Sequence, residues 1–439
     1  VHRTGDTLGL KEGDTIQVWN RVLEWDGDCV TAAMADRWSR ESDPLCDAAL
    51  DALFPKGTSS IGTNLFNTLE EHARVAPVDD PARVFFEALL QNPPPELCAS
   101  PQDVTIASDF FLENSAQIGQ GLSFFGLAGG FARHVSRIVQ TLNAVSYLVS
   151  GSKSTSVGPP DQSTKVQDDR THIRLVETLQ FVLDTMGFTS STELWAKPTV
   201  NSKRVGAHIF PGGAGWRSAA TVRMLHGITR RRARERLNRE SDQPLDFVPV
   251  NQFDMSGTLA AFSTVPIWSL AILGVPATER EAYAYLAVWR QIGFYLGVSP
   301  AILRAHFTSP YRADKFLASA IIHLFTPVAG DMTLAAPTLP ILRALANRSP
   351  TYTSFEYNCA IARYLIGPEL ADYLHIPPTS TTMALRLRTV IALQALPVYF
   401  GRIYPRQGWH AARHFYIHEA LVAVTQANLG MRRTMFRPR

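Results

Sequence analysis

Apolar residues recur along most of the chain with the period of an α-helix. They stand at positions i, i+3, i+4 and i+7, which places them on one face of a helix. Runs in which apolar and polar residues alternate, as in a half-buried strand, are nearly absent. The pattern predicts an all-α protein with helices over Val104–Leu112, Phe131–Val149, His172–Thr185, Ser218–Asn238, Glu279–Leu296, Ala301–Leu324, Thr381–Leu396 and Trp409–Ala427.

Helix ends and loops can also be located. Gly187 and Gly297 each follow a periodic apolar segment and predict helix ends there. Gly151–Gln167, rich in Ser, Thr, Gly and Pro, and the proline-containing Gln91–Pro95 predict loops. A length of 439 residues is typical of about three domains. Because neither loop marks a strong change in composition, we predict a single large helical domain over residues 1–439.

One long segment carries no charge. Met255–Thr278 is long enough to span a bilayer. It also contains several serines and threonines, together with Pro266, and after Gly274 it turns directly to Pro276 and Glu279. We therefore expect a buried helix with a break at Pro266 rather than a membrane span.

Composition and charge favour some classes of function and exclude others. Apolar residues make up 46% of the chain and charged residues only 18%, against about 25% charged in an average soluble protein. This predicts a large core or a bound apolar group. A net charge of +3 and an arginine cluster over 230–239 without interleaved aromatic residues argue against nucleic-acid binding. The cysteines show no C-x-x-C spacing, so no zinc cluster or dithiol motif is predicted.

The run 216–230 carries the most informative group of residues. At about 100° per residue, Arg223, His226 and Arg230 lie on one helix face. Two cations lower the proton affinity of an imidazole between them and leave a nitrogen lone pair free. Such a histidine suits axial coordination of haem iron, and the arginines suit the haem propionates. A plain surface or interdomain polar cluster remains the alternative.

The wider pattern resembles a known family. The motif R-x-x-H-x-x-x-R at 223–230 is followed by Val250–Thr258, the uncharged segment, Leu273–Pro276 and Glu279–Val298. In order and spacing this series is similar to the mpaB and rubber-oxygenase family, which includes bacterial latex-clearing proteins and fungal oxygenases bound to the endoplasmic reticulum. The resemblance covers residues 111–325.

The resemblance implies an all-helical fold with globin-like helix packing around one haem b. Residues 111–325 would form the haem-binding core, with peripheral helices in 1–110 and 326–439. His226 occupies the position of the proximal ligand, and the two flanking arginines and Thr258 occupy further family positions. Asn251 and Asp254 would orient His226 or the arginines; simple helix capping is the alternative.

On the distal side, the resemblance implies a glutamate acting as a base, and Glu177 stands at a comparable place. A salt bridge to Arg174, one turn earlier, is the alternative role for this carboxylate. Latex-clearing members also carry an Arg-x-x-Lys-Thr motif. Here Lys197 stands in that neighbourhood without the flanking residues.

Other signals are weaker. His410, His414 and His418 follow an i, i+4, i+8 spacing without an H-E-x-x-H motif, so a surface or interdomain cluster is favoured over a metal site. Pro211–Gly215 resembles a phosphate loop but lacks its Lys-Ser/Thr ending, and we read it as the turn before the helix of His226. No G-x-S-x-G motif is present, which argues against a hydrolase of that type.

Together these features predict a haem b oxygenase that uses dioxygen to cleave a C=C bond in an apolar, isoprenoid or polyene-like substrate, either a small molecule or a polymer. One alternative is a haem enzyme that hydroxylates, epoxidises or rearranges another small molecule. The other is a helical haem or lipid carrier without turnover. Because the chain begins with Val1 rather than Met, we expect a preceding targeting segment, possible membrane association through it, and an endoplasmic-reticulum or secreted location.

Overall fold

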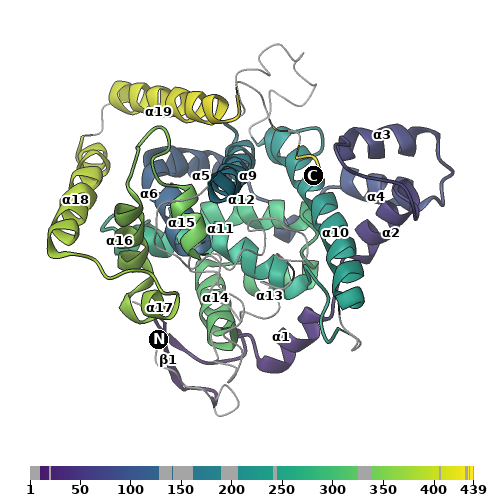
Figure 1. Ribbon diagram of the computed structural model, residues 1–439, viewed down its shortest axis with the longest axis horizontal. Coiled ribbons are helices and arrows are strands. Elements are labelled where there is room, and N and C mark those ends of the chain that lie inside the picture. The colour runs from purple at the N-terminus through teal and green to yellow at the C-terminus, as the bar shows by residue number, and fades with distance from the viewer. Residues whose placement is uncertain are drawn as a thin grey trace.

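A computed structural model describes residues 10–18, 21–127, 141, 162–188, 206–240, 245–324, 338–404, 407–430, 434 and 436–438. Helices dominate these residues, as the apolar pattern predicts (Figure 1). One antiparallel strand pair near the N-terminus, with Thr15 opposite Glu24, is the exception. The all-α fold class is confirmed.

The N-terminal part of the chain consists of short elements. They are β1 (Thr15–Val18), β2 (Arg21–Glu24), α1 (Ala32–Ser39), α2 (Pro44–Leu53), α3 (Leu65–Val75), α4 (Pro81–Leu90), η1 (Pro95–Leu97), α5 (Pro101–Glu113), α6 (Ser115–Gln120) and the π-helical η2 (Gly121–Leu127).

Longer helices form the middle and C-terminal parts. They are α9 (Gln162–Met186), η4 (Ala207–Ile209), α10 (Ala214–Glu240), α11 (Gln252–Ile272), α12 (Glu279–Tyr295), α13 (Pro300–His306), α14 (Pro310–Leu324), α15 (Thr338–Ala344), α16 (Phe355–Ile366), α17 (Pro368–Tyr373), α18 (Thr381–Ile403) and α19 (Gln407–Asn428).

Local signals set many helix boundaries. Thr278 begins α12 with a capping box, in which its hydroxyl accepts from Glu281 N at 3.2 Å and the Glu281 carboxylate accepts from Thr278 N at 2.7 Å. The helix predicted over Ala301–Leu324 is wrong as one element, because α13 ends before Phe307 and α14 starts at Pro310. Proline has no N–H for the carbonyl four residues earlier and disfavours helical geometry in the residue before it. The helix expected over Phe131–Val149 lies outside the described residues, except for Thr141.

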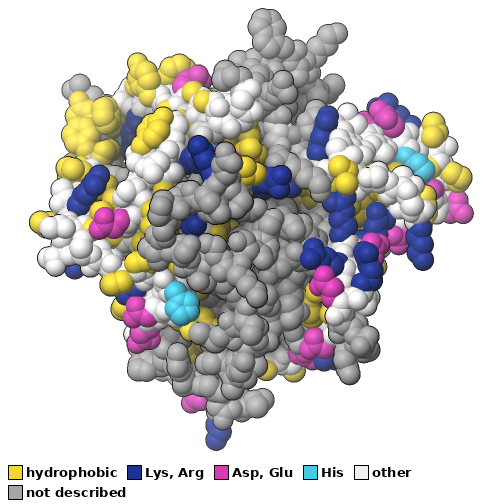
Figure 2. Space-filling view, in the orientation of Figure 1, with side chains coloured by type: hydrophobic (Ala, Val, Ile, Leu, Met, Phe, Trp, Pro, Cys, Tyr) yellow, Lys and Arg dark blue, Asp and Glu magenta, His cyan; other side chains and the backbone are white. Residues whose placement is uncertain are grey.

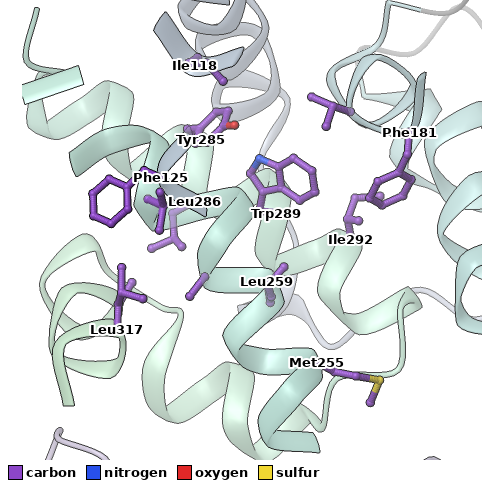
Figure 3. Close-up of a cluster of buried hydrophobic side chains, with 14 of the residues drawn as sticks. Ile118, Phe125, Phe181, Met255, Leu259, Tyr285, Leu286, Trp289, Ile292 and Leu317 are labelled. Atoms are coloured by element: carbon purple, nitrogen blue, oxygen red, sulfur yellow. The ribbon is translucent and has the colours of Figure 1, made fainter. Parts of the chain in front are cut away.

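Helix α12 lies at the centre of the core. All residues from Ala284 to Gly293 are buried, which indicates a helix enclosed on every side. Figure 3 shows Tyr285, Leu286, Trp289 and Ile292 of this helix among side chains from α6, η2, α9, α11 and α14.

Helix α11 corrects the expected break at Pro266, because the helix continues through this residue from Gln252 to Ile272. Pro266 leaves the carbonyl of Phe262 without its usual helical donor. The hydroxyl of Tyr285, on α12, donates to this carbonyl at 3.2 Å. A tertiary hydrogen bond therefore replaces the missing helical one. The other part of the expectation, a helix that is mostly buried, agrees with the structure.

The remaining helices surround this core. Helices α2, α3 and α4 pack together on one side, whereas α18 and α19 lie on the opposite periphery (Figure 1). Among the described helices, α11 and α18 are long and apolar enough to cross a bilayer.

Candidate functional site

Helix α10, which carries His226, crosses α9 at very short range. A Cβ atom at Gly215 would lie 2.8 Å from the carbonyl oxygen of Asp184, so only glycine permits this approach. Three residues later, the Ser218 hydroxyl donates to the buried Asp184 carboxylate at 2.6 Å. Gly215 and Ser218 thus pack the start of α10 on α9. The turn predicted over Pro211–Gly215 is present at residues 211–213, whereas Ala214 and Gly215 already belong to the helix.

His226 lies on a partly exposed stripe of α10 with Val222, Leu225 and Thr229. Its Nδ1 atom is buried and has no hydrogen-bond partner among the described residues. Burial and the nearby charge of Arg230 lower the pKa of His226 to about 4, against the opposing effect of Asp43. The imidazole is therefore neutral at physiological pH and retains a lone pair that a metal can accept.

Both arginines of the motif are engaged by aspartates of the α2 region. Arg223 donates to Asp43 from Nε at 2.6 Å and from Nη2 at 2.8 Å. Arg230 pairs with Asp47 and donates from Nε and Nη2 to the Val250 carbonyl. These contacts fasten α10 to α2 on both sides of His226. Propionate binding by the arginines stays a prediction, and it would compete with these aspartates.

Asn251 and Asp254 form the start of α11. The Asn251 side chain accepts from Asp254 N at 2.9 Å, while its amide nitrogen donates to the Asp254 carboxylate at 2.9 Å and to the Val248 carbonyl at 2.8 Å. These bonds cap the start of α11, which is the alternative role predicted for Asn251 and Asp254. Because Val250, whose carbonyl holds Arg230, immediately precedes this cap, the segment also helps to position that arginine.

Of the two distal candidates, Glu177 and Lys197, the structure describes Glu177. Glu177, on α9, is buried and accepts from Arg174 Nη1 at 3.1 Å and from the Thr434 hydroxyl at 3.1 Å. The alternative ion pair to Arg174 is therefore present. Lys197 lies outside the described residues. Catalytic roles for Glu177 and Lys197 stay predictions.

A cavity of about 620 Å³ lies between η2, α9, α11, α14 and the segment after α15. This volume is typical of small-molecule sites. Thr258 lines the cavity, with its hydroxyl hydrogen-bonded to the Asp254 carbonyl at 2.8 Å. His226, Arg223, Arg230 and Glu177 do not line it. Of the predicted site residues that the structure describes, Thr258 alone lines the cavity.

The cavity wall is largely apolar and has an aromatic layer behind it. Phe262 lines the cavity and stacks on Trp289, with ring centroids 5.1 Å apart. Phe181 contacts both rings edge-on, at 6.3 Å from Phe262 and 6.0 Å from Trp289. Such a wall suits an apolar ligand.

The cavity also contains polar residues that sequence reasoning missed. His172 Nε2 lies 3.0 Å from Asn428 Oδ1, and burial lowers the pKa of His172. Arg348 lies on the same wall. His172 was recognised only as the first residue of a predicted helix. No local signal distinguishes it, because its partner Asn428 is 256 residues away.

The histidines of α19 separate into two groups. His410 and His414 contact Glu113, at the end of α5, whereas His418 lies 3.4 Å from its neighbour Glu419. His410 and His414 therefore join α19 to α5, and the choice between an ion-pair cluster and a metal site stays a prediction.

Comparisons with known proteins place the chain in a family. The model of the family "ER-bound oxygenase mpaB/B'/Rubber oxygenase, catalytic domain" matches residues 121–396. A solved structure titled "Structure of Latex Clearing Protein LCP in the closed state" has 16% identical residues and a TM-score of 0.53, covering 87% of this chain and 88% of that chain. No curated protein matches the chain. The chain therefore belongs to the family of mpaB-type and rubber oxygenases.

Proposed function

We propose that this protein is a haem b oxygenase that acts on an apolar, unsaturated substrate, and that His226 would hold the haem iron. The observation that carries the proposal is the neutral, partly buried imidazole of His226 within the segment that matches the family. Its Nδ1 atom has no hydrogen-bond partner in the part of the chain that the structure describes. An imidazole in this state is suited to coordinate iron.

The residues around His226 fit this assignment. The ion pairs of Arg223 and Arg230 with α2 hold the helix turns on either side of the histidine. Burial and the charge of Arg230 keep the ring unprotonated. When bound, haem would supply the activation of dioxygen, while the protein supplies orientation and a dry, apolar environment.

The cavity next to Thr258 is proposed to take the substrate. Its wall, including Leu179, Ala261 and Phe262, would exclude water and pack against an isoprenoid or polyene chain. Cleavage of a C=C bond, which yields two carbonyl products, is the reaction we propose. Hydroxylation, epoxidation or rearrangement, and a carrier role without turnover, are the competing outcomes.

An absorption spectrum tests the cofactor. Protein produced with sufficient haem should show a Soret band, and its absence would refute the proposal. His226→Ala should lose most of this band. The matched variant His172→Ala removes the histidine on the cavity wall. It should retain the band, because it leaves His226 in place. The reverse result would assign the haem to His172.

Oxygen uptake and product analysis test the reaction. With a panel of polyenes and prenylated compounds, the haem-loaded enzyme should consume oxygen and form aldehydes or ketones. Alcohols or epoxides would indicate one of the alternative reactions. No uptake across the panel would support the carrier role.

Membrane association is also proposed for this protein, with the lipid bilayer as the partner. Side chains of α18 and α19 expose several large apolar groups, and hydrophobic side chains gather at the upper left of Figure 2, where these helices lie. The most exposed are Leu385, Leu393, Leu396, Phe400, Ile403, Phe415 and Tyr416. Helix α18 contains Arg386, Arg388 and Arg402 and no acidic residue, which favours an anionic lipid surface.

A further inference from the structure

Four ionisable side chains meet where α19 crosses α5, away from His226 and outside the wall of the cavity. Asp109 and Glu113 are one turn apart on α5, and His410 and His414 are one turn apart on α19. The ligand atoms of Glu113, His410 and His414 lie within 4.8 Å of one another. A carboxylate and two imidazoles are a common ligand set for zinc.

The two distances from Glu113 to the imidazoles match those expected between ligands of a tetrahedral metal ion. Glu113 Oε1 lies 3.2 Å from His410 Nδ1 and 3.5 Å from His414 Nε2. Two ligands at about 2.0–2.1 Å from a tetrahedral zinc ion stand about 3.3 Å apart. The buried Nε2 of His414 makes no hydrogen bond among the described residues, so its lone pair is available. Glu113 thus stands at the separation expected of two zinc ligands from each imidazole, and the two imidazole nitrogens lie within 4.8 Å of each other.

Asp109 supports this arrangement from behind His414. Its Oδ1 atom lies 3.6 Å from His414 Nδ1, on the ring side opposite the Nε2 that faces Glu113. A carboxylate at this place favours a proton on Nδ1 and directs Nε2 toward a metal. Three protein ligands would leave the fourth position for water.

The local charge also favours a cation. Glu113 and Asp109 place two carboxylates beside the imidazole of His414. Arg413 is the nearby opposing charge; its Nη2 atom donates to the Glu113 backbone carbonyl at 2.9 Å and its Nη1 atom to the Pro397 carbonyl at 3.3 Å. Two carboxylates outnumber this one guanidinium group.

We propose that Glu113, His410 and His414 bind a divalent transition-metal ion of the zinc class, with Asp109 orienting His414. The ion would fasten α19 to α5. Helix α19 contributes Val424 and Asn428 to the cavity wall, and the residues after α5 contribute the wall from Ala116 onward. The site would therefore stabilise two elements that enclose the cavity without itself belonging to it.

Metal titration of the full chain, purified without a polyhistidine tag and stripped with a chelator, tests the proposal. Isothermal titration with Zn²⁺ should give one site per chain, and Co²⁺ should give the visible absorption of a tetrahedral complex. Zn²⁺ should also raise the thermal unfolding midpoint. Because haem binding is measured separately, through the Soret band, failure of this site leaves the proposed haem function untouched.

The variants separate a metal site from a plain ion-pair cluster. His414→Ala and Glu113→Gln should each abolish Zn²⁺ binding and the Co²⁺ spectrum. Asp109→Asn should weaken Zn²⁺ binding by about 10- to 100-fold, as expected for a residue that orients a ligand. His418→Ala, on the same helix one turn beyond His414, should leave binding unchanged.

Several outcomes would overturn the assignment. They are an absence of Zn²⁺ binding by the parent protein, unchanged binding in both His414→Ala and Glu113→Gln, or equal loss in His418→Ala. Far-UV circular dichroism establishes that each variant is folded. If His414→Ala does not fold, Asp109→Asn and Glu113→Gln, which preserve side-chain size, decide the question.

Discussion

At the scale of single residues, the charge around His226 is controlled by ion pairs that join distant parts of the chain. Asp43 and Arg223 are 180 residues apart and both are well buried. Asp43 also accepts from Cys46 N at 3.4 Å as the cap of α2. Its carboxylate therefore serves both the helix start and the guanidinium group beside His226.

Asp43→Asn should lower the free energy of unfolding by about 3 kcal/mol, because it leaves a buried guanidinium group without its counter-charge. Asparagine is an equally good helix cap, so the variant isolates the ion pair. Asp36→Asn, which breaks an exposed pair with Arg40, should cost less than about 1 kcal/mol. Denaturant unfolding measures both; equal costs would contradict the role of the Asp43 pair.

The pKa of His226 makes a second prediction, for the haem-free protein. Its value of about 4 in the folded chain lies below the value of about 6.5 in an unfolded chain. Between these values the unfolded state binds more protons, so stability should fall as the pH drops from about 6.5 towards 4. At pH 5 this histidine alone should lower the free energy of unfolding by about 2 kcal/mol relative to its value at pH 7.

His226→Gln should flatten this pH dependence by the same amount. Unfolding midpoints of parent and variant at pH 7 and pH 5 give the comparison. An undiminished pH dependence in the variant would mean that other groups, such as His208 with its pKa lowered to about 4 by burial, are responsible.

Glu177 provides a third prediction. In the haem-loaded enzyme, Glu177→Gln should keep the Soret band and lose most of the turnover if this residue is the base. Turnover per haem is the measurement, with thermal stability as the control. Lower stability with unchanged turnover would assign Glu177 to its ion pair with Arg174 and its contact with Thr434.

At the scale of elements, α11 shows how a neighbouring helix changes the effect of a proline. Sequence reasoning expected a break at Pro266 because proline removes a helical hydrogen bond. The continuous helix is explained by Tyr285, which supplies a donor from α12 to the freed Phe262 carbonyl. The aromatic packing of Phe262 on Trp289 holds the same segment in place.

A double-mutant cycle tests this explanation. Tyr285→Phe should cost about 1 kcal/mol of stability, because the part-buried Phe262 carbonyl loses its donor. In a Pro266→Ala background, where the helix supplies its own N–H, the same substitution should cost clearly less. Equal costs in the two backgrounds would contradict the proposed replacement of one hydrogen bond by another.

At the scale of the whole molecule, the peripheral helices differ in their exposed surfaces. Exposed apolar side chains are numerous on α18 and α19, whereas Val75 and Val78 belong to the region of α3 and α4, helices that lie on the opposite side of the protein (Figure 1). Large contiguous apolar patches mark sites of interaction. This asymmetry is the basis for the proposed membrane association.

Vesicle co-sedimentation tests that proposal. The protein should bind vesicles of phosphatidylcholine with phosphatidylserine more strongly than vesicles of phosphatidylcholine alone. Replacing both Leu396 and Ile403 with Glu should weaken binding by about tenfold or more. Each substitution removes apolar side-chain area that would otherwise be buried in the bilayer. The matched control, Val75→Glu with Val78→Glu, should bind as the parent does. Binding unaffected by the α18 variant, or a dimer that this variant dissociates, would argue against the bilayer as partner.

The sequence by itself determined the helical class, most helix positions and the motif around His226. These features depend on local periodicity, caps and short spacings, which are visible within one or two helical turns. It also pointed to the family through the order of segments between residues 111 and 325, and the family match confirms that assignment.

Only the tertiary structure decided which charged groups meet. The partners of Arg223 and Arg230 come from α2, that of His172 comes from α19, and those of His410 and His414 come from α5. Each contact joins residues more than 150 positions apart, and no local pattern encodes such pairs. The cavity has the same origin, because its volume is the space left between helices that meet only when the chain is packed.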